Sequence, residues 1–246
     1  MVCRLEANAL LAQWERALGQ VASARDDVLL QGLSDATTAP RRLGERNARL
    51  LVLHAQIFGS ELALLSHCPA CATAAQFSAD CEALAAQTPD IEAASSPHRL
   101  EAEGHSIEFR LPESTDLADI TAASGVQDDD KFASALLARC VLTCTRDGAG
   151  VQPNELPMSV LDALSQRMDA LDPCASVSFA LECPECATHW DARLDVGQQL
   201  WTKLRAVAER ILLDVDALAR AYGWTESEVL RLSPTRRAAY LQLVSA

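Results

Sequence analysis

Apolar residues recur at helical spacing through the first quarter of the chain. Residues 1–20 predict an amphipathic helix, because acidic residues interrupt an apolar pattern of helical period. Residues 28–33 add a second apolar cluster, and the polar stretch 34–40 predicts a loop. Residues 43–65 predict one long helix that Gly59 interrupts or ends. The apolar face of this helix consists of Leu50, Leu51, His54, Ile57 and Phe58.

Alternation of apolar and polar positions indicates strands in two places. Residues 99–111 alternate around Gly104, which predicts a β-hairpin. A second strand pair flanks the CPEC turn that begins at Cys183. The alternating apolar positions of this pair are Val177, Phe179, Leu181, Trp190, Ala192 and Leu194.

Further helices are predicted from helical periodicity and from terminal signals. Their expected ranges are 116–120, 132–144, 159–171, 197–222, a short helix that ends near 232, and a last helix that ends at 244. The helix over 132–144 should end in the turn at 146–148. The expected caps are Gly223 after the long helix, a capping box of Thr225 and Glu228, and Ser233 before Pro234.

These patterns predict an α+β fold that is mostly helical, with β-hairpins and a C-terminal helical extension. Three regions are expected along the chain. Residues 1–66 form an N-terminal helical region, and residues 67–196 form an α+β region of hairpins with an acidic insertion. Residues 197–246 form the long helix and a capped helical tail.

Charge restricts the function classes that fit this chain. The net charge of −13 argues against a nucleic-acid-binding protein, which needs a basic face to neutralise phosphates. Residues 78–130 hold thirteen acids against two arginines, and we interpret these carboxylates as solvated surface charge. Residues 197–246 hold seven basic residues against five acids. No apolar run is long enough to span a membrane, so no membrane contact is expected.

The nine cysteines include a short internal repeat, which is the most specific feature of the sequence. CPACAT begins at Cys68 and CPECAT begins at Cys183, and an aspartate follows twelve residues after each of these cysteines. No secretory-signal pattern precedes the cysteines. In a reducing compartment CxxC pairs are typically metal ligands, so the sequence predicts a cytoplasmic protein with metal-binding knuckles.

One CxxC knuckle supplies half of a tetrahedral site, and two knuckles complete it with four thiolates. We therefore predict one structural Zn²⁺ held by Cys68, Cys71, Cys183 and Cys186, in a split arrangement that resembles a zinc ribbon. Three alternatives remain open at this point. In the first, both knuckles are reduced and free of metal. In the second, each knuckle forms its own disulfide, and in the third, His189 completes a separate CxxCxxH site.

The remaining cysteines and histidines give weaker signals. Cys140 and Cys144 lie four residues apart on a predicted helix, but buried small hydrophobes are the favoured interpretation, as for Cys3, Cys81 and Cys174. His54 is expected to be a hydrogen-bonded core residue. His67 and His189 flank the knuckles and are candidate donors to the sulfurs. P-loop, GxGxxG, HExxH and GxSxG motifs are all absent, so the sequence predicts no enzyme and no small-molecule substrate.

Four segments together resemble the baseplate-hub assembly proteins of contractile-tailed bacteriophages and of related phage-tail-like injection systems. They are LGERNARLLVLHAQIFGSEL, the knuckle CPAC, IEFRLPESTDLADI, and the long segment that begins at ECPECATHW and ends in LARAYGWTESEVLRLSPTRRAAYLQLV. The family is similar to the hub assembly chaperones of T-even phages. This resemblance implies a non-catalytic protein that binds a hub, spike or other baseplate component during tail assembly.

Residues 218–244 are the most specific part of this resemblance, and we interpret them as a partner-binding element. The alternative is that Trp224 packs the corner between the helices. Aromatic residues beside arginines are enriched at binding hot spots. The predicted contact residues are Tyr222, Trp224, Arg236, Arg237 and Tyr240. A transcription regulator is the alternative, because the tail also fits a helix-turn-helix with Arg231, Arg236 and Arg237 beside a zinc ribbon.

Overall fold

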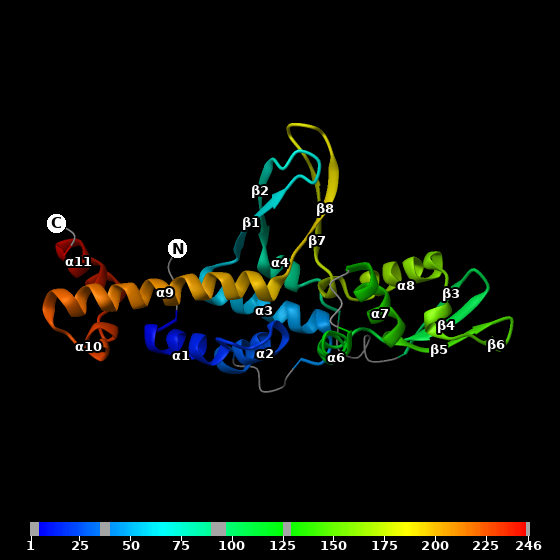
Figure 1. The fold of residues 1–246 in the computed structure, drawn as a ribbon, viewed down its shortest axis with the longest axis horizontal. Helices are drawn as coiled ribbons and strands as arrows, with labels where there is room; N and C mark the ends of the chain where they lie inside the picture. Colours follow the sequence, from blue (N-terminus) through cyan, green and yellow to red (C-terminus); the bar gives the residue numbers. More distant parts are fainter. Residues whose placement is uncertain (1–4, 35–39, 90–96, 125–128, 245–246) are drawn as a thin grey trace.

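A computed structural model describes residues 5–34, 40–89, 97–124 and 129–244. The fold is α+β, as the sequence predicts. Figure 1 shows an elongated body with the sheet of strands β3 to β6 at one end and the C-terminal helices at the other. A finger made of two β-hairpins projects from the middle of this body. The predicted metal site lies in this finger.

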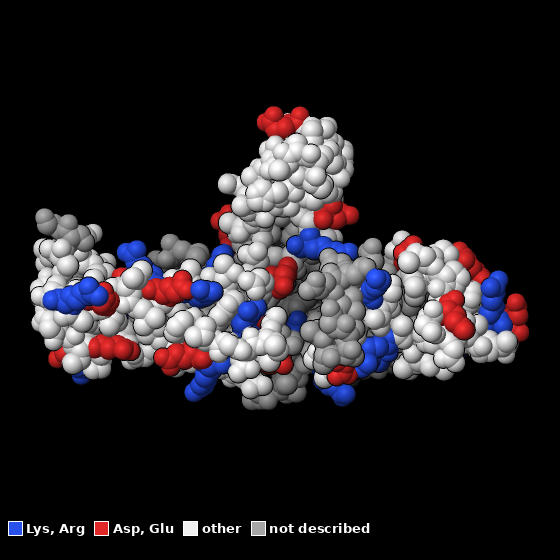
Figure 2. Space-filling view, in the orientation of Figure 1, with Lys and Arg blue, Asp and Glu red and all other residues white. Residues whose placement is uncertain are grey.

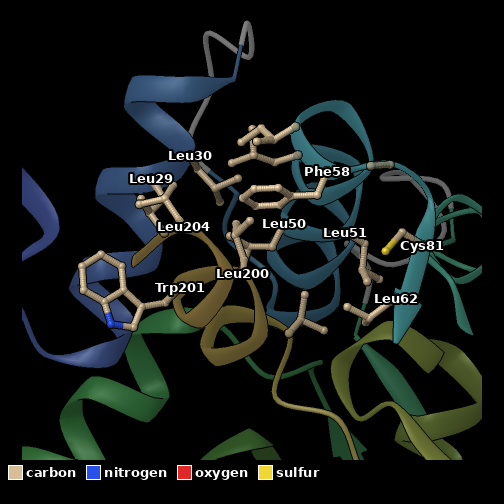
Figure 3. Close-up of a cluster of buried hydrophobic side chains, with 14 of the residues drawn as sticks. Leu29, Leu30, Leu50, Leu51, Phe58, Leu62, Cys81, Leu200, Trp201 and Leu204 are labelled. Carbon is tan, nitrogen blue, oxygen red and sulfur yellow. The ribbon is translucent and has the colours of Figure 1, made fainter. Parts of the chain in front are cut away.

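Four helices build the main core of the body. They are α1 (Ala7–Ala17), α2 (Ala22–Leu33), α3 (Leu43–Phe58) and α9 (Val196–Tyr222). Figure 3 shows Leu50 of α3 facing Leu200 and Leu204 of α9, with Leu29 and Leu30 of α2 beside them. The same core includes Leu62, Leu64, Val177 and Leu194, which lie in or next to the finger strands. The base of the finger is therefore part of the main core.

The finger consists of two antiparallel hairpins from distant parts of the sequence. The first pairs β1 (Glu61–His67) with β2 (Ala74–Asp80), and the second pairs β7 (Ser178–Glu182) with β8 (His189–Arg193). Helix α4 (Cys81–Ala85) follows β2 directly. Figure 1 shows the two hairpins side by side, with both loops at the far end.

A second hydrophobic core lies at the sheet end of the body. Its sheet has the order β3 (His98–Ala102), β4 (His105–Phe109), β5 (Val141–Arg146) and β6 (Ala149–Gly150). Ile107 and Phe109 of β4 are fully buried against Val160 and Leu164 of the helix Met158–Leu171. Helices α7 (Asp129–Cys140) and α8 (Met158–Leu171) and the 3-10 turn at Pro153–Glu155 belong to this part. Helix α6 (Ser114–Ser124) contacts α7 and α2, and the 3-10 turn at Pro173–Ala175 contacts α3 and α8, so both connect the two cores.

The C-terminal helices have the caps that the sequence predicts. Helix α9 ends at Gly223, whose φ of 69° is the left-handed conformation that glycine adopts without strain. Helix α10 (Glu226–Leu230) begins with a complete capping box of Thr225 and Glu228. The Ser233 hydroxyl then accepts the backbone N–H of Arg236 at the start of α11 (Pro234–Val244).

Two predictions about local structure are wrong, and one strand was missed. The long helix expected over 43–65 ends at Phe58, and Glu61–His67 forms strand β1 instead. Gly59 at a φ of 96° breaks the helix, and the alternating burial of β1 follows from Leu62 and Leu64 pointing into the core. The helix expected over 132–144 ends at Cys140, and the residues from Val141 onward form strand β5 instead. Strand β2 was not anticipated at all.

The acidic segment is not uniformly solvated. Asp116 is 2% exposed, and its two carboxylate oxygens accept hydrogen bonds of 2.7 Å from the guanidinium of Arg110. Arg139 lies 3.3 Å from the same carboxylate and 2.6 Å from that of Asp119. The prediction of a solvated face is therefore wrong at Asp116. Part of the segment, like residues 35–39 of the loop predicted over 34–40, lies outside the described residues.

Candidate metal centre

The two knuckles have the same backbone structure. In the first, the N–H of Cys68 donates to the Thr73 carbonyl and the N–H of Ala72 donates to the Cys68 carbonyl, both at 2.9 Å. Cys183 and Ala187 make the equivalent bonds in the second knuckle, again at 2.9 Å. Ala72 and Ala187 are both left-handed, with φ values of 60° and 56°. The repeated CPxCAT sequence thus encodes one loop twice.

The loops bring all four predicted ligands together. The sulfurs of Cys68, Cys71, Cys183 and Cys186 lie within 4.8 Å of one another, and all four cysteines are free. The sulfur of Cys186 lies 3.6 Å from Cys68 and 3.5 Å from Cys71, and Cys71 lies 3.5 Å from Cys183. Four Zn–S bonds of about 2.3 Å in a tetrahedron require S···S distances of about 3.8 Å. The four cysteines therefore form a cluster of the size that a metal ion needs.

Two threonines complete the surroundings of the sulfurs. Thr73 Oγ1 lies 3.2 Å from the Cys71 sulfur, and Thr188 Oγ1 lies 3.2 Å from the Cys186 sulfur. The Thr188 hydroxyl and backbone amide lower the pKa of Cys186 to about 6, and the Thr73 groups lower the pKa of Cys71. Hydrogen bonds to sulfur favour the thiolate, which is the form that binds a metal. These threonines were missed, although both belong to the repeat.

The predicted histidine donors are not beside the sulfurs. The Nε2 of His189 points to Glu182 at 3.6 Å, and its side chain is 77% exposed. His67 is exposed at the end of β1. Neither belongs to the cluster of possible metal ligands among the described residues. This geometry therefore does not support the alternative CxxCxxH site with His189. All four knuckle cysteines are free, which does not support the alternative of a disulfide in each knuckle.

Side chains between the hairpins hold the knuckles in place. The Trp190 indole Nε1–H donates to the Ser66 hydroxyl at 3.1 Å, and the rings of Phe77 and Phe179 meet edge to face at 5.2 Å. Phe179 and Phe77 also pack against the main core. Apolar packing therefore positions the base of the finger, and the cysteine cluster joins its far end.

The aspartates of the internal repeat have the same role in both copies. Asp80 caps α4, where its carboxylate accepts the N–H of Ala83 at 2.8 Å. Asp195 caps α9, where its carboxylate accepts the N–H of Gln198 at 2.9 Å. Each copy of the repeat is therefore a strand, a knuckle, a strand and a capped helix start. The cysteine cluster is linked to two helices of the body by two short strands.

The other described cysteines are buried in the body, as predicted. Cys140 and Cys144 lie in the second core, and burial raises the pKa of Cys140 to about 12. Cys174 donates to the Leu84 carbonyl at 3.1 Å. The Cys81 sulfur lies 3.3 Å from His54 Nδ1. None of these four belongs to the metal-ligand cluster, and Cys3 lies outside the described residues.

The predicted partner-binding residues lie together at one end of the body. The rings of Tyr222 and Trp224 stack at 4.7 Å, and Tyr240 meets both edge to face. Tyr222 is 40% exposed and Arg236 is exposed. Arg237 differs, because it is 8% exposed and lies 3.5 Å from the Asp214 carboxylate. It is placed to position α11 on α9 rather than to contact a partner or DNA.

A scan against protein-family models, a search of curated proteins and a search of solved structures each find no match for this chain. Within the described residues, no helix is long and apolar enough to span a bilayer.

Proposed function

We propose that Cys68, Cys71, Cys183 and Cys186 bind one structural zinc ion. The observation that carries this proposal is the group of four free sulfurs with contacts of 3.5–3.6 Å between the two knuckles. Four thiolates are typical of closed zinc sites, which leave no coordination position for a substrate or a catalytic water. The ion therefore joins the hairpins and has no chemical step of its own.

Metal analysis tests the zinc directly. Protein purified without chelator should contain one zinc per chain, and Cys183→Ser should abolish binding. Cys144→Ser is the matched control, because Cys144 is buried in the second core and not in the cluster. Absence of metal in the wild-type protein, or zinc retained by Cys183→Ser, would reject the four-thiolate site.

We further propose that the protein is a non-catalytic, cytoplasmic assembly factor that binds a hub, spike or other baseplate component of a contractile tail. The resemblance of residues 218–244 to tail-assembly proteins supports this function. So does the position of those residues at a free end of the body, with an aromatic cluster and the exposed Leu243. Exposed apolar and aromatic groups that are grouped on a surface are typical of protein-binding sites.

A binding measurement with the recombinant hub and spike proteins of the same genome tests this function. The double substitution Tyr222→Ala and Tyr240→Ala should weaken binding at least tenfold, since aromatic anchors contribute most at such interfaces. Met158→Ala is the control, because Met158 is 63% exposed near the opposite end. A gel shift with DNA at low salt tests the alternative regulator, and sequence-specific DNA binding would contradict the assembly function.

A further inference from the structure

The described cysteines fall into two classes by exposure. Cys71 and Cys186 at the end of the finger are exposed, whereas the other six are buried. An oxidant must reach a sulfur to react with it, so exposed thiolates are oxidised first. Figure 2 shows that the far end of the finger stands clear of the body on the visible face. An oxidant in solution therefore meets Cys71 and Cys186 before any other described cysteine.

The two exposed sulfurs are also close to each other. They are 3.5 Å apart, and each belongs to a different knuckle. A disulfide needs a sulfur separation of about 2.05 Å, so the two hairpin ends must approach by about 1.5 Å. Apart from the cysteine contacts, the Trp190–Ser66 hydrogen bond joins the hairpins near this end, and the Phe77–Phe179 ring contact lies toward the base. Small movements of the hairpins therefore bring these sulfurs to bonding distance.

A disulfide within one knuckle meets a different constraint. The loop between Cys68 and Thr73 is held by two backbone hydrogen bonds and a left-handed alanine, and the second loop is identical. The described sulfur contacts of 3.5–3.6 Å in the cluster all run from one knuckle to the other. A disulfide between Cys71 and Cys186 therefore needs an approach of the two loops and no change within either loop.

We propose that Cys71 and Cys186 are an oxidation site that forms a disulfide between the knuckles and releases the zinc. This inference rests on the zinc proposed above, and the oxidant is a hydroperoxide. One thiolate attacks the peroxide, the O–O bond breaks, and a sulfenic acid and an alkoxide or hydroxide form. The second thiolate attacks that sulfur, forms the S–S bond and expels hydroxide. Two thiolates are oxidised by two electrons in total, and the peroxide is reduced.

The consequence for the fold is a change of cross-link. After oxidation only Cys68 and Cys183 remain as ligands, and two thiolates do not complete a tetrahedral zinc site. The disulfide joins the same two loops that the ion joined and closes a chain segment of the same length. The finger should therefore persist after oxidative loss of zinc, whereas chelation of the reduced protein leaves the far ends of the hairpins without a cross-link.

Peptide mapping tests the pairing. Zinc-loaded full-length protein is treated with equimolar hydrogen peroxide, free thiols are blocked with N-ethylmaleimide, and the protein is digested without reductant. Mass spectrometry should find the two knuckle peptides linked, with N-ethylmaleimide on Cys68 and Cys183 and one zinc released per disulfide. Disulfides within single knuckles, or first oxidation at Cys81, Cys140, Cys144 or Cys174, would overturn the assignment.

Two further measurements separate the oxidation site from the zinc. Zinc content before oxidation tests the metal proposal alone. If the protein contains no zinc but still forms the Cys71–Cys186 disulfide, the zinc proposal is rejected and the oxidation site is retained. A zinc-loaded chain that forms other disulfides rejects only the oxidation site.

Oxidised protein should also melt at a higher temperature than chelated, reduced protein. Equal melting temperatures would show that no new cross-link joins the hairpins. Cys174→Ser, outside the finger, should behave like the wild type throughout.

Discussion

His54 should make the fold sensitive to acid. It lies on α3 and is 2% exposed, the Lys203 ammonium lies 2.9 Å from its Nε2, and the Cys81 sulfur lies 3.3 Å from its Nδ1. Burial, and then the charge of Lys203, lower the pKa of His54 from 6.5 to about 4. The prediction of a hydrogen-bonded core histidine is therefore confirmed.

The direction and size of the stability loss that His54 causes at low pH follow from the difference between its folded and unfolded pKa values. The folded-state pKa lies below the unfolded value, so stability is fully present above pH 6.5 and is lost as the pH falls toward 4. With an unfolded pKa of about 6.5 and a folded pKa of about 4, the loss between pH 7.5 and 5.0 is about 2 kcal/mol. This is a substantial fraction of the stability of a typical domain.

Urea unfolding of the wild type and of His54→Gln at both pH values isolates this loss. Glutamine keeps an acceptor for Lys203 but does not titrate in this range. At pH 7.5 the variant should be less stable, because it loses the ring contact with Phe58. At pH 5.0 that deficit should shrink by about 2 kcal/mol. Comparing the two proteins at each pH cancels other groups, including Asp26, whose pKa burial raises to about 6.

Lys203→Met provides the graded control. Removing the ammonium raises the pKa of His54, because the neighbouring charge disfavours the imidazolium. This variant should therefore lose less stability between pH 7.5 and 5.0 than the wild type. An equal deficit of His54→Gln at both pH values would refute the reasoning and show that His54 is not held neutral by its surroundings.

Three other substitutions test separate contacts. Trp190→Phe removes the indole donor to Ser66 but keeps a ring, and urea unfolding should show a loss of about 1 kcal/mol. Thr188→Val removes the hydroxyl beside the Cys186 sulfur, and competition with a chromogenic chelator should show zinc affinity reduced by about 10- to 100-fold. Gly223→Ala places a Cβ in a left-handed conformation, and thermal unfolding should show a cost of about 1 kcal/mol.

Much of the helical part could be predicted because local chemistry decides it. The caps at Gly223, Thr225 and Ser233 act within a few residues, so their sequence signatures suffice. The four metal-ligand candidates could be predicted for the same reason, since CxxC spacing defines each half of the cluster. The fold determines that the two CxxC knuckles meet, and the internal repeat was the sequence signal that predicted this contact.

The errors occur where tertiary contacts override local periodicity. Leu62, Leu64 and Leu65 continue the helical spacing of α3, but β1 buries the first two and leaves Leu65 57% exposed. Strand β2 contains small and polar residues, so its alternation is weak. The repeat offered a better argument. Because Cys183 is predicted to lie between two strands, the repeated motif at Cys68 should also lie between two strands, which predicts the first hairpin.

The two hairpins differ at exposed positions as well as at core positions such as Leu62 and Val177. The outward positions of β1 and β2 include Leu65, paired with Gln76, and the stretch 62–79 contains no charged residue. The equivalent positions of the second hairpin are Ala180, paired with Asp191. Figure 2 shows acids at the far end of an otherwise largely uncharged finger. Since the cysteines, threonines and capping aspartates are the same in both copies, a substitution at Leu65 or at Ala180 changes one outer face and leaves the metal cluster intact.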